Sequence, residues 1–494
     1  MKKILSALIV IIMLIPVLIS CGKRNDPSDT AAPDDSDLTG ETAPVSEFEP
    51  ADVDYGGHEI RIYGYGPDEG TSWKGLTCNE IASHEMTGDT INDAVYMRTR
   101  EIEELYNVKI TPILISGSDR NTIASKLQPL ILAGEDAFDY AMVNGNCLPA
   151  MMNLVSGLVE LTSIGGLDLS KSWWDKSAFE NFSVGKKLYA ATGDISLYNY
   201  LAAQGKYFNK KLIDDYQLEN PYDIVRRGEW TWGKLHEMSR AVVSDLNGDN
   251  VIDGWDRIGM IAEFQALRDG VISAGIKLVS KDADDLPVLT MMHDRSVTVV
   301  GKIFDVLADK SCNFLYGFTK GLEDWDRVMA KYLNNEALFF NSQLDSALEF
   351  RVMESDFGIL PNPKADETQD KYYSIVTMSY TDFVCIPVTC TDVERTVNII
   401  QALGYYGRQY VRPAFYDVTV THKAVRDGDS LDMLDVILNN IMYDIGYAFN
   451  FDGVNDIFNG IMLKGNNTFV STYESYAPKI NAAIDKMVES FGIK

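Results

Sequence analysis

The chain has 494 residues, of which 46% are hydrophobic and 11% are aromatic, and it carries a formal net charge of -28 at pH 7. A chain of this length exceeds what one compact core can bury, so we expect two lobes or domains. The strong negative charge argues against nucleic acid or an anionic membrane surface as a partner, and it favours an acidic, soluble exterior.

The N-terminus carries a targeting pattern. Lysines at positions 2–3 precede an apolar-rich run over residues 4–19, and Ser20 stands directly before Cys21. The run is short for a membrane span but typical of a secretory signal. A small residue before Cys resembles the bacterial lipobox, in which the Cys is acylated and the peptide is cut before it; an ordinary signal with a chance Cys is the alternative. We expect residues 1–20 to be a signal peptide and the acylated Cys21 to anchor the protein at the extracellular face of the cell membrane.

The segment that follows lacks the composition of a folded domain. Residues 21–54 are rich in Asp, Ser, Thr and Pro and short of aromatic residues, so they cannot bury a core. We expect a disordered acidic stalk between the acylated Cys21 and the folded part.

The folded part opens with a βαβ pattern. Residues 57–63 alternate like a strand, residues 88–106 have the spacing of an amphipathic helix, and residues 107–115 have the composition of a second strand. Tyr65 follows the first strand, in a loop of the kind that faces a cleft in an open α/β sheet.

A second transition from strand to loop follows. Residues 124–132 predict a helix, and the next buried strand ends at Asn144. The amides of Asn144 and Asn146 can donate hydrogen bonds to hydroxyl groups and accept them. A plain turn is an equally good interpretation.

The stretch over residues 206–260 is the most informative part of the chain. An aromatic strand end at residues 207–209 leads into a short helix at 210–216, and Thr231 stands as the N-cap of a second helix.

The same stretch continues into a loop with the spacing of a calcium site. Oxygen-bearing side chains occupy loop positions 1, 3, 5, 9 and 12, and a backbone carbonyl would serve at position 7. Position 6 is Asn250 rather than Gly, but Asn tolerates positive φ. Position 12 is Asp rather than Glu, so we expect structural Ca²⁺ in loop 245–256 with a Kd weaker than about 10⁻⁵ M; an acidic turn without an ion is the alternative. The expected ligands are Asp245, Asn247, Asp249, Val251, Asp253 and Asp256.

Later elements continue the α/β pattern. Their hydrophobic spacing predicts strands at 259–262 and 335–341 and helices at 264–274, 294–307, 325–333, 391–410, 431–445 and 475–491.

Several stretches together resemble one family. They include GDTINDAVYMRTREIEELYNVKI, the WWD at 173–175, GKKLY at 185–189, KYFNKKLIDDYQLENPYDIVRRGEWTWGKL, DFGILPNPK and PAFYDV. Their order is similar to that of the family 1 extracellular solute-binding proteins, which are the sugar-capturing subunits of bacterial ABC importers. The first stretch is close to the opening of a clostridial-type branch, and the resemblance extends from about residue 55 to the C-terminus.

The resemblance implies a two-lobed α/β fold of the periplasmic-binding-protein type II class. Each lobe would be a mixed sheet flanked by helices, with the ligand cleft between the lobes and the chain crossing near Asp194 and Asp382. The implied boundaries are 55–193 for lobe 1, 194–382 for lobe 2, 383–425 for a return segment of lobe 1, and 426–494 for C-terminal helices mainly of lobe 2.

The resemblance also implies a function. The protein would bind a mono- or oligosaccharide and deliver it, as a monomer and unchanged, to ABC transporter permease subunits. Aromatic rings offer flat apolar faces to sugar rings, while amides and carboxylates pair with hydroxyls. The expected ligand-binding residues are Tyr65, Asn144, Asn146, Trp173, Tyr198, Trp325, Asn341, Tyr380, Asp382 and Tyr416.

The sequence lacks the common catalytic motifs that would favour an enzyme over this interpretation. The sequence contains no H-E-x-x-H, G-x-S-x-G or Walker A pattern, and its five His are scattered. A cell-surface glycoside-acting enzyme with a carboxylate pair stays an alternative, as do an adhesin and an importer protein for a non-sugar solute.

We expect the remaining cysteines to be mostly buried free thiols, with a Cys385–Cys390 bridge as the alternative; they are Cys78, Cys147, Cys312, Cys385 and Cys390.

Overall fold

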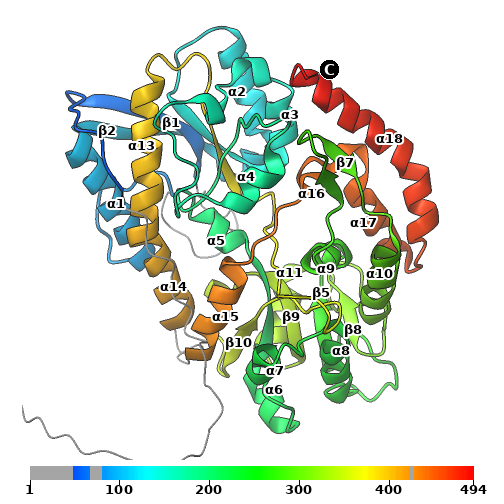
Figure 1. Cartoon of the computed structure of the whole chain (residues 1–494). Coiled ribbons are helices and arrows are strands. Elements are labelled where there is room, and N and C mark those ends of the chain that lie inside the picture. Colours follow the sequence, from blue (N-terminus) through cyan, green and yellow to red (C-terminus); the bar gives the residue numbers. More distant parts are fainter. Residues whose placement is uncertain (1–47, 67–79, 422–427, 494) are drawn as a thin grey trace, which may run out of the picture. The chain divides into compact units, whose positions relative to one another are not determined.

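The computed structural model describes residues 48–66, 80–421 and 428–493 of the chain (Figure 1). The expected signal peptide, the expected acylation at Cys21 and nearly all of the expected stalk lie outside these ranges. The described residues form two large sheets and a two-stranded hairpin of β6 (Val279–Lys281) and β7 (Pro287–Leu289). No helix in this part of the chain is long and apolar enough to cross a membrane.

The first sheet has the strand order β11-β3-β1-β2. Three of its strands run parallel, and β11 pairs antiparallel with β3. The strands are β1 (His58–Gly66), β2 (Val108–Ser116), β3 (Tyr140–Asn144) and β11 (Asp382–Cys385). Every residue of β3 and β11 is buried, as expected for a largely parallel sheet covered on both faces.

The helix α1 (Thr90–Tyr106) connects β1 to β2 and confirms the helix predicted over residues 88–106. Asp89 caps its N-terminus by accepting hydrogen bonds from two backbone N–H groups, and Asn107 ends it in the left-handed region at φ 48°. The other helices associated with this part of the chain are α2 (Ile123–Leu132), α3 (Leu148–Met152), α4 (Lys176–Phe182) and α5 (Tyr198–Ala202).

The second sheet has the order β10-β4-β9-β5-β8. Its strands β5, β8 and β9 are parallel, whereas β4 pairs antiparallel with β9 and β10 antiparallel with β4. The strands are β4 (Gln204–Asn209), β5 (Ile258–Ala262), β8 (Asn313–Leu315), β9 (Ala337–Gln343) and β10 (Phe357–Leu360).

Seven helices accompany the second sheet in chain order. Thr231 caps α8 by accepting a hydrogen bond from Lys234 N, which confirms the predicted N-cap. The helices are α6 (Lys210–Asp215), α7 (Pro221–Arg226), α8 (Trp232–Ala241), α9 (Ala266–Ser273), α10 (Asp294–Leu307), α11 (Trp325–Leu333) and α12 (Ser346–Phe350).

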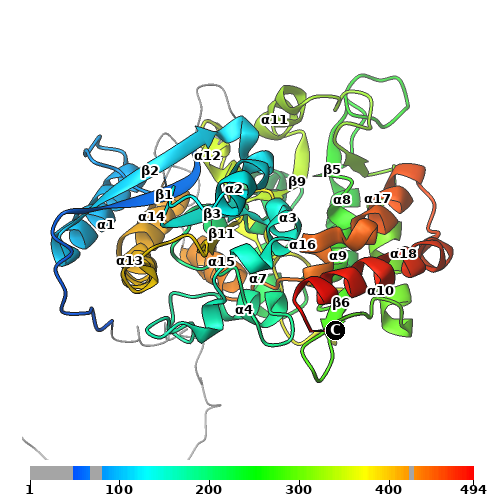
Figure 2. The ribbon, with the colours of Figure 1, turned by 90° about the horizontal axis from the view of Figure 1, so that it is seen from above.

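The C-terminal helices pack against helices that flank both sheets. In both views α13 and α14 lie beside α1, and α18 lies beside α10 (Figures 1 and 2). The helix α17 packs against α9 and α18. These helices are α13 (Val393–Tyr406), α14 (Arg412–Thr421), α15 (Gly428–Leu438), α16 (Ile445–Phe449), α17 (Val454–Lys464) and α18 (Phe469–Ser490).

The predicted helix at 431–445 is wrong in its second half. The helix ends at Leu438, and Ser374 then pairs with the following segment: Ser374 N donates to Asn440 O at 3.0 Å and Met442 N donates to Ser374 O at 2.7 Å. A tertiary backbone pairing therefore replaces the helical hydrogen bonds that the periodicity predicts. The new helix α16 starts only where Asp444 caps it.

The predicted helix at 391–410 is also shorter than expected. It ends at Tyr406, and a π-helical turn over Gly407–Val411 leads into α14. A Cβ on Gly407 would lie 2.0 Å from Asp194 O, so only Gly permits this close approach of the chain to the first crossing segment.

Candidate functional site

Each of the two large sheets has one edge formed by the carboxyl ends of its parallel strands, which we call its carboxyl edge. In the first sheet β1 ends at Gly66 and β3 ends at Asn144; in the second sheet β5, β8 and β9 end at Ala262, Leu315 and Gln343. In open α/β sheets, ligands bind outside the carboxyl ends of the strands. The side chains just beyond these five positions are therefore the candidates for ligand contact.

The segment 377–382 links the two edges. Thr377 Oγ1 accepts a hydrogen bond at 3.0 Å from Gln343, the last residue of β9. Gly145 N, directly after β3, donates to Thr381 O at 2.9 Å. The carboxyl edges of the two sheets thus meet at one connecting segment, which Figure 1 shows between the sheets.

A buried acidic cluster lies where this segment enters β11. The Tyr65 hydroxyl donates to Asp382 Oδ1, and the carboxyl groups of Asp382 and Glu80 hydrogen-bond each other. The Glu80 carboxylate also accepts from Ser196 Oγ at 3.0 Å and from Tyr198 N at 3.2 Å. One cluster therefore ties the end of β1, the first crossing segment and the second crossing segment together.

Burial controls the protonation of the two carboxyl groups. Loss of solvation raises the pKa of Glu80, and loss of solvation with the nearby Glu80 charge raises the pKa of Asp382 further above its ordinary value. Two carboxylates in contact cannot both stay ionised. Asp382 is therefore the group that holds the proton.

Replacement of Asp382 by Asn is expected to flatten the pH dependence of stability. A carboxyl group whose pKa is raised in the folded state stabilises that state below its ordinary pKa, and this contribution is lost as pH rises toward the raised value. The free energy of unfolding of the wild type should fall relative to Asp382→Asn by up to about 1.4 kcal/mol per pH unit above about pH 4. Urea unfolding at several pH values measures the difference, and parallel curves for the two proteins would contradict the assignment of the proton.

Amide side chains gather at the end of β3. Asn144 Nδ2 donates to Asn121 Oδ1 at 3.1 Å, and Asn146 Nδ2 approaches the same oxygen at 3.4 Å. Asn144 is buried, yet its Oδ1 has no hydrogen-bond partner among the described residues. A buried acceptor without a donor is costly, so this oxygen is suited to a hydroxyl donor.

Aromatic rings gather at the carboxyl edge of the second sheet. Tyr316 directly follows β8 and packs edge-on against Trp325 at 5.7 Å between ring centroids. Phe264, two residues after β5, packs against Phe318 at 5.6 Å. The Trp325 Nε1–H donates to Glu349 at 3.0 Å, which orients the half-buried indole.

Two further expected residues, Tyr198 and Tyr380, lie on or beside the crossing segments. Tyr198 is fully buried and stacks on Tyr65 at 5.9 Å between centroids. Tyr380 belongs to the segment 377–382, and the Arg120 guanidinium lies 4.9 Å from its ring centroid. Seven of the ten expected ligand-binding residues thus lie at or beside the two edges or on the crossing segments, and four of them, Tyr65, Asn144, Tyr198 and Asp382, are buried. The other three are Asn146, Trp325 and Tyr380.

Trp173 and Tyr416 lie elsewhere. The Trp173 indole is buried and donates to Gln401 at 3.0 Å, because it packs in the core beneath α13. Tyr416 extends from α14 and donates to Asp435 of α15 at 3.0 Å. Both rings make contacts within helical packing and do not join the edge groups.

Asn341 is also engaged inside its sheet. It lies on β9 opposite Lys206 of β4, whose buried ammonium donates to the Asn341 and Asn362 side-chain oxygens. Loss of solvation lowers the pKa of Lys206 to about 7. The Asn341 side-chain oxygen thus accepts a hydrogen bond from the buried Lys206 ammonium inside the sheet.

Sequence reasoning missed several residues of this region. Glu80, Asn121 and Glu349 belong to no recognisable sequence pattern, and only the folded chain brings them near the expected residues. For Tyr316, which the sequence analysis also missed, a signal existed: it is an aromatic residue directly after Phe314 and Leu315. That pair is too short for periodicity to identify it as part of a strand.

Three of the six ligands expected in loop 245–256 lie close together. Carboxylate oxygens of Asp245, Asp249 and Asp256 all lie within 4.8 Å of one another. Asn250 adopts φ 62°, as its position in the loop predicts. The Asp245 carboxylate accepts from Gly248 N at 2.6 Å and Asn250 N at 2.8 Å, and these bonds lower its pKa. The donor set is oxygen only and suits a hard cation such as Ca²⁺.

The four described cysteines are free thiols. Cys147, Cys312, Cys385 and Cys390 are all buried and unbridged. The alternative of a Cys385–Cys390 bridge is therefore wrong, and Cys78 lies outside the described residues.

Comparisons with known proteins give matches at the level of structure alone. No protein-family model matches the chain, and no curated protein matches it. The sugar-binding protein MalE from Xanthomonas citri is similar, with a TM-score of 0.60 at 12% identity over 88% of this chain and 100% of that chain.

Two other solved structures have comparable similarity. UgpB from Mycobacterium tuberculosis in complex with glycerophosphocholine has a TM-score of 0.56 at 14% identity, covering 88% of this chain and 100% of that chain. The ABC substrate-binding protein Lmo0181 from Listeria monocytogenes in complex with cycloalternan has a TM-score of 0.51 at 13% identity, covering 89% and 100%. The chain therefore has the two-lobed periplasmic-binding-protein-like fold, with mixed sheets flanked by helices.

Proposed function

We propose that this protein is the solute-binding subunit of an ABC importer, and that it binds a mono- or oligosaccharide at the facing edges of its two sheets. The observation that carries the proposal is the meeting of the two carboxyl edges at segment 377–382, with polar groups on one edge and aromatic rings on the other. A sugar presents hydroxyls and apolar C–H faces, and this pair of edges can satisfy both. The sequence resemblance supports two further parts of the proposal. The protein would deliver the sugar to permease subunits as a monomer, and it would belong to the clostridial-type branch.

We infer that the bound sugar leaves chemically unchanged. Glycosidases hold their two catalytic carboxyl groups about 5 to 9.5 Å apart to flank the scissile bond, whereas the Glu80 and Asp382 carboxyl groups hydrogen-bond each other. This pair leaves no room for a glycosidic bond between its members. The acidic pair therefore connects the two crossing segments through hydrogen bonds.

A non-sugar solute is the second candidate. UgpB was solved with glycerophosphocholine, which carries a phosphodiester. The carboxylates of Glu80 and Glu349 would oppose a phosphodiester anion. The neutral hydroxyls of a carbohydrate suit this environment better.

A thermal-shift screen against sugars, amino acids and glycerophosphodiesters tests the proposal. A ligand at 100 times its Kd should stabilise the folded state by about 2.7 kcal/mol. Stabilisation by a carbohydrate supports the proposal. Stabilisation by another class alone replaces it.

We also propose that loop 245–256 binds Ca²⁺ as a structural ion. Removal of Ca²⁺ by a chelator should destabilise the protein by about 2.7 kcal/mol relative to Ca²⁺ at 100 times its Kd. Asp249→Ala should abolish this response, because it removes one of the three clustered carboxylates. Asp284→Ala, in an exposed acidic turn of a different loop, is the control and should keep it. Identical melting curves with chelator and with Ca²⁺ would refute the site.

We propose further that acylated Cys21 anchors the protein at the extracellular face of the cell membrane. Cys21→Ala should release the protein from membranes or leave it unprocessed. Membrane fractionation measures this, and a matured variant that still sediments with membranes would show that another anchor exists.

A further inference from the structure

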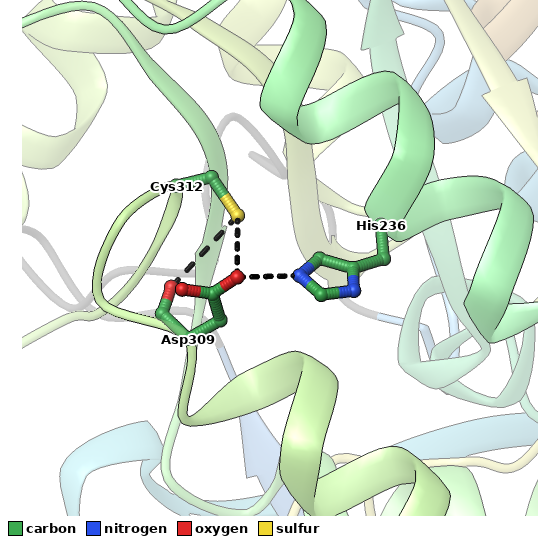
Figure 3. A group of neighbouring side chains, drawn as sticks. All are labelled: His236, Asp309 and Cys312. Carbon is green, nitrogen blue, oxygen red and sulfur yellow. Dashed lines mark hydrogen bonds and ion pairs between the residues drawn. The ribbon is translucent and has the colours of Figure 1, made fainter.

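A group of three potential metal ligands lies away from both edges. His236 projects from α8, while Asp309 and Cys312 belong to the loop between α10 and β8, and the three side chains point toward one another (Figure 3). His236 Nε2 lies 2.7 Å from Asp309 Oδ2, and Cys312 Sγ lies 3.8 Å from the same oxygen. One ligand atom from each residue lies within 4.8 Å of the other two.

The chemistry of this group differs from that of loop 245–256. An imidazole, a thiol and a carboxylate are the three side chains that bind Zn²⁺, with metal–ligand distances of about 2.0 to 2.3 Å. Such distances place the ligands of a tetrahedral ion roughly 3.3 to 3.8 Å apart. A small adjustment that moves the carboxylate away from the imidazole would give the three atoms this spacing.

The Asp309 carboxylate is oriented for this role. Its Oδ1 accepts hydrogen bonds from Ser311 N at 3.0 Å and Ser311 Oγ at 2.6 Å, so Oδ2 is directed at His236. Burial opposes ionisation of Asp309, but hydrogen bonds from Ser311, Arg240 and His236 outweigh it and lower the pKa of the carboxyl group. The group is therefore a carboxylate, and its negative charge faces the imidazole and the thiol.

A cation already occupies the open side of this carboxylate. Arg240 Nη2 donates to Asp309 Oδ2 at 2.7 Å, and the Arg240 side chain is 61% exposed. An exposed guanidinium can swing into water at little cost, because a surface ion pair contributes little to stability. A metal ion can thus replace Arg240 without leaving a buried charge unpaired.

We propose that His236, Asp309 and Cys312 form a binding site for a borderline or soft divalent transition-metal ion of the Zn²⁺ class, with solvent at the fourth position. As the metal–sulfur bond forms, the Cys312 S–H bond breaks and its proton leaves to solvent. The neutral imidazole of His236 would bind through Nε2 in the tautomer that carries its proton on Nδ1. The thiol is a weak acid in the metal-free protein, since burial and the Asp309 charge raise the pKa of Cys312 to about 11.

The ion would join the helix α8 to two strands of the second sheet, β5 and β8. Cys312 directly precedes β8, and its carbonyl accepts hydrogen bonds from Gly259 N at 2.7 Å and Met260 N at 3.2 Å of β5. His236 brings in α8. The ion therefore acts as a structural clamp at the amino end of β8, opposite the edge that carries Tyr316.

Titration of the chelator-treated full chain with Co²⁺ tests the proposal, because Co²⁺ replaces Zn²⁺ and reports its ligands by absorption. We expect one ion per chain with a near-ultraviolet sulfur-to-metal charge-transfer band, displaced by Zn²⁺ and unaffected by Ca²⁺. Cys312→Ser should remove the band, and His236→Gln should keep it at saturation while weakening binding at least about 10-fold.

Two controls separate this site from other groups. Cys390→Ser removes another buried thiol, and Asp245→Ala alters the loop 245–256; both should keep the band and the affinity. The absence of saturable Co²⁺ binding, or a charge-transfer band that persists in Cys312→Ser, would overturn the proposal. Because His236 is partly exposed on α8, His236→Gln gives a second, independent result if Cys312→Ser fails to fold.

Discussion

Arg98→Met is expected to destabilise the protein by about 3 to 5 kcal/mol. Arg98 extends from α1, is completely buried, and donates to the backbone carbonyls of Ile195 and Ile81 at 3.1 Å each, and to that of Glu80. Met fills a similar volume but has no donor. The variant would leave buried carbonyls unsatisfied and would remove the positive charge that faces the Glu80 carboxylate.

The same helix supplies the matched control for this prediction. Arg100 is exposed and pairs with Glu104 one turn along α1, so Arg100→Met should change the free energy of unfolding by less than about 0.5 kcal/mol. Urea unfolding of both variants measures the difference. Equal effects of the two substitutions would show that the Arg98 contacts do not hold the first crossing segment.

Trp325→Ala is expected to weaken carbohydrate binding by about 2 to 4 kcal/mol, or roughly 30- to 1000-fold in Kd. The indole is half-buried, packs edge-on against Tyr316 and is oriented by Glu349. A pre-oriented aromatic ring binds a sugar face with little loss of conformational entropy. Its removal takes away both the stacking surface and the group that fixes Glu349.

Trp255 provides the control for this substitution. It belongs to loop 245–256, is 47% exposed and lies under the Arg327 guanidinium at 4.9 Å. Trp255→Ala should therefore leave the Kd of the sugar unchanged. Isothermal titration with the carbohydrate found in the thermal-shift screen measures both variants, and an unchanged Kd for Trp325→Ala would remove this edge from the binding surface.

Local patterns predicted much of the fold. The Thr231 cap and the spacing of α10 and α11 could be predicted because each depends on neighbours within one or two turns. The break at Leu438 was not readable, because it depends on pairing with Ser374, more than sixty positions earlier in the sequence. Long-range backbone contacts override helical periodicity there.

The candidate site was predictable only in part for the same reason. Tyr65 was expected at the site because loops after strand ends face the cleft in open α/β sheets. Asn144 and Asp382 were expected there from the family resemblance. Trp173 was expected there from its aromatic character, yet aromatic rings fill cores as readily as clefts, and this ring packs under α13. Glu80 joins the site through tertiary contacts that no local pattern records.

Native mass spectrometry of the protein after incubation with a mixed pool of oligosaccharides, amino acids and glycerophosphodiesters tests the central claim most directly. Because the complex is weighed intact, one spectrum gives the class of the ligand, its stoichiometry and whether its bonds survive. The account predicts one intact mono- or oligosaccharide bound per chain after hours of incubation. A bound non-carbohydrate solute, or a pool whose glycosidic bonds have been cut by the pure protein, would contradict it.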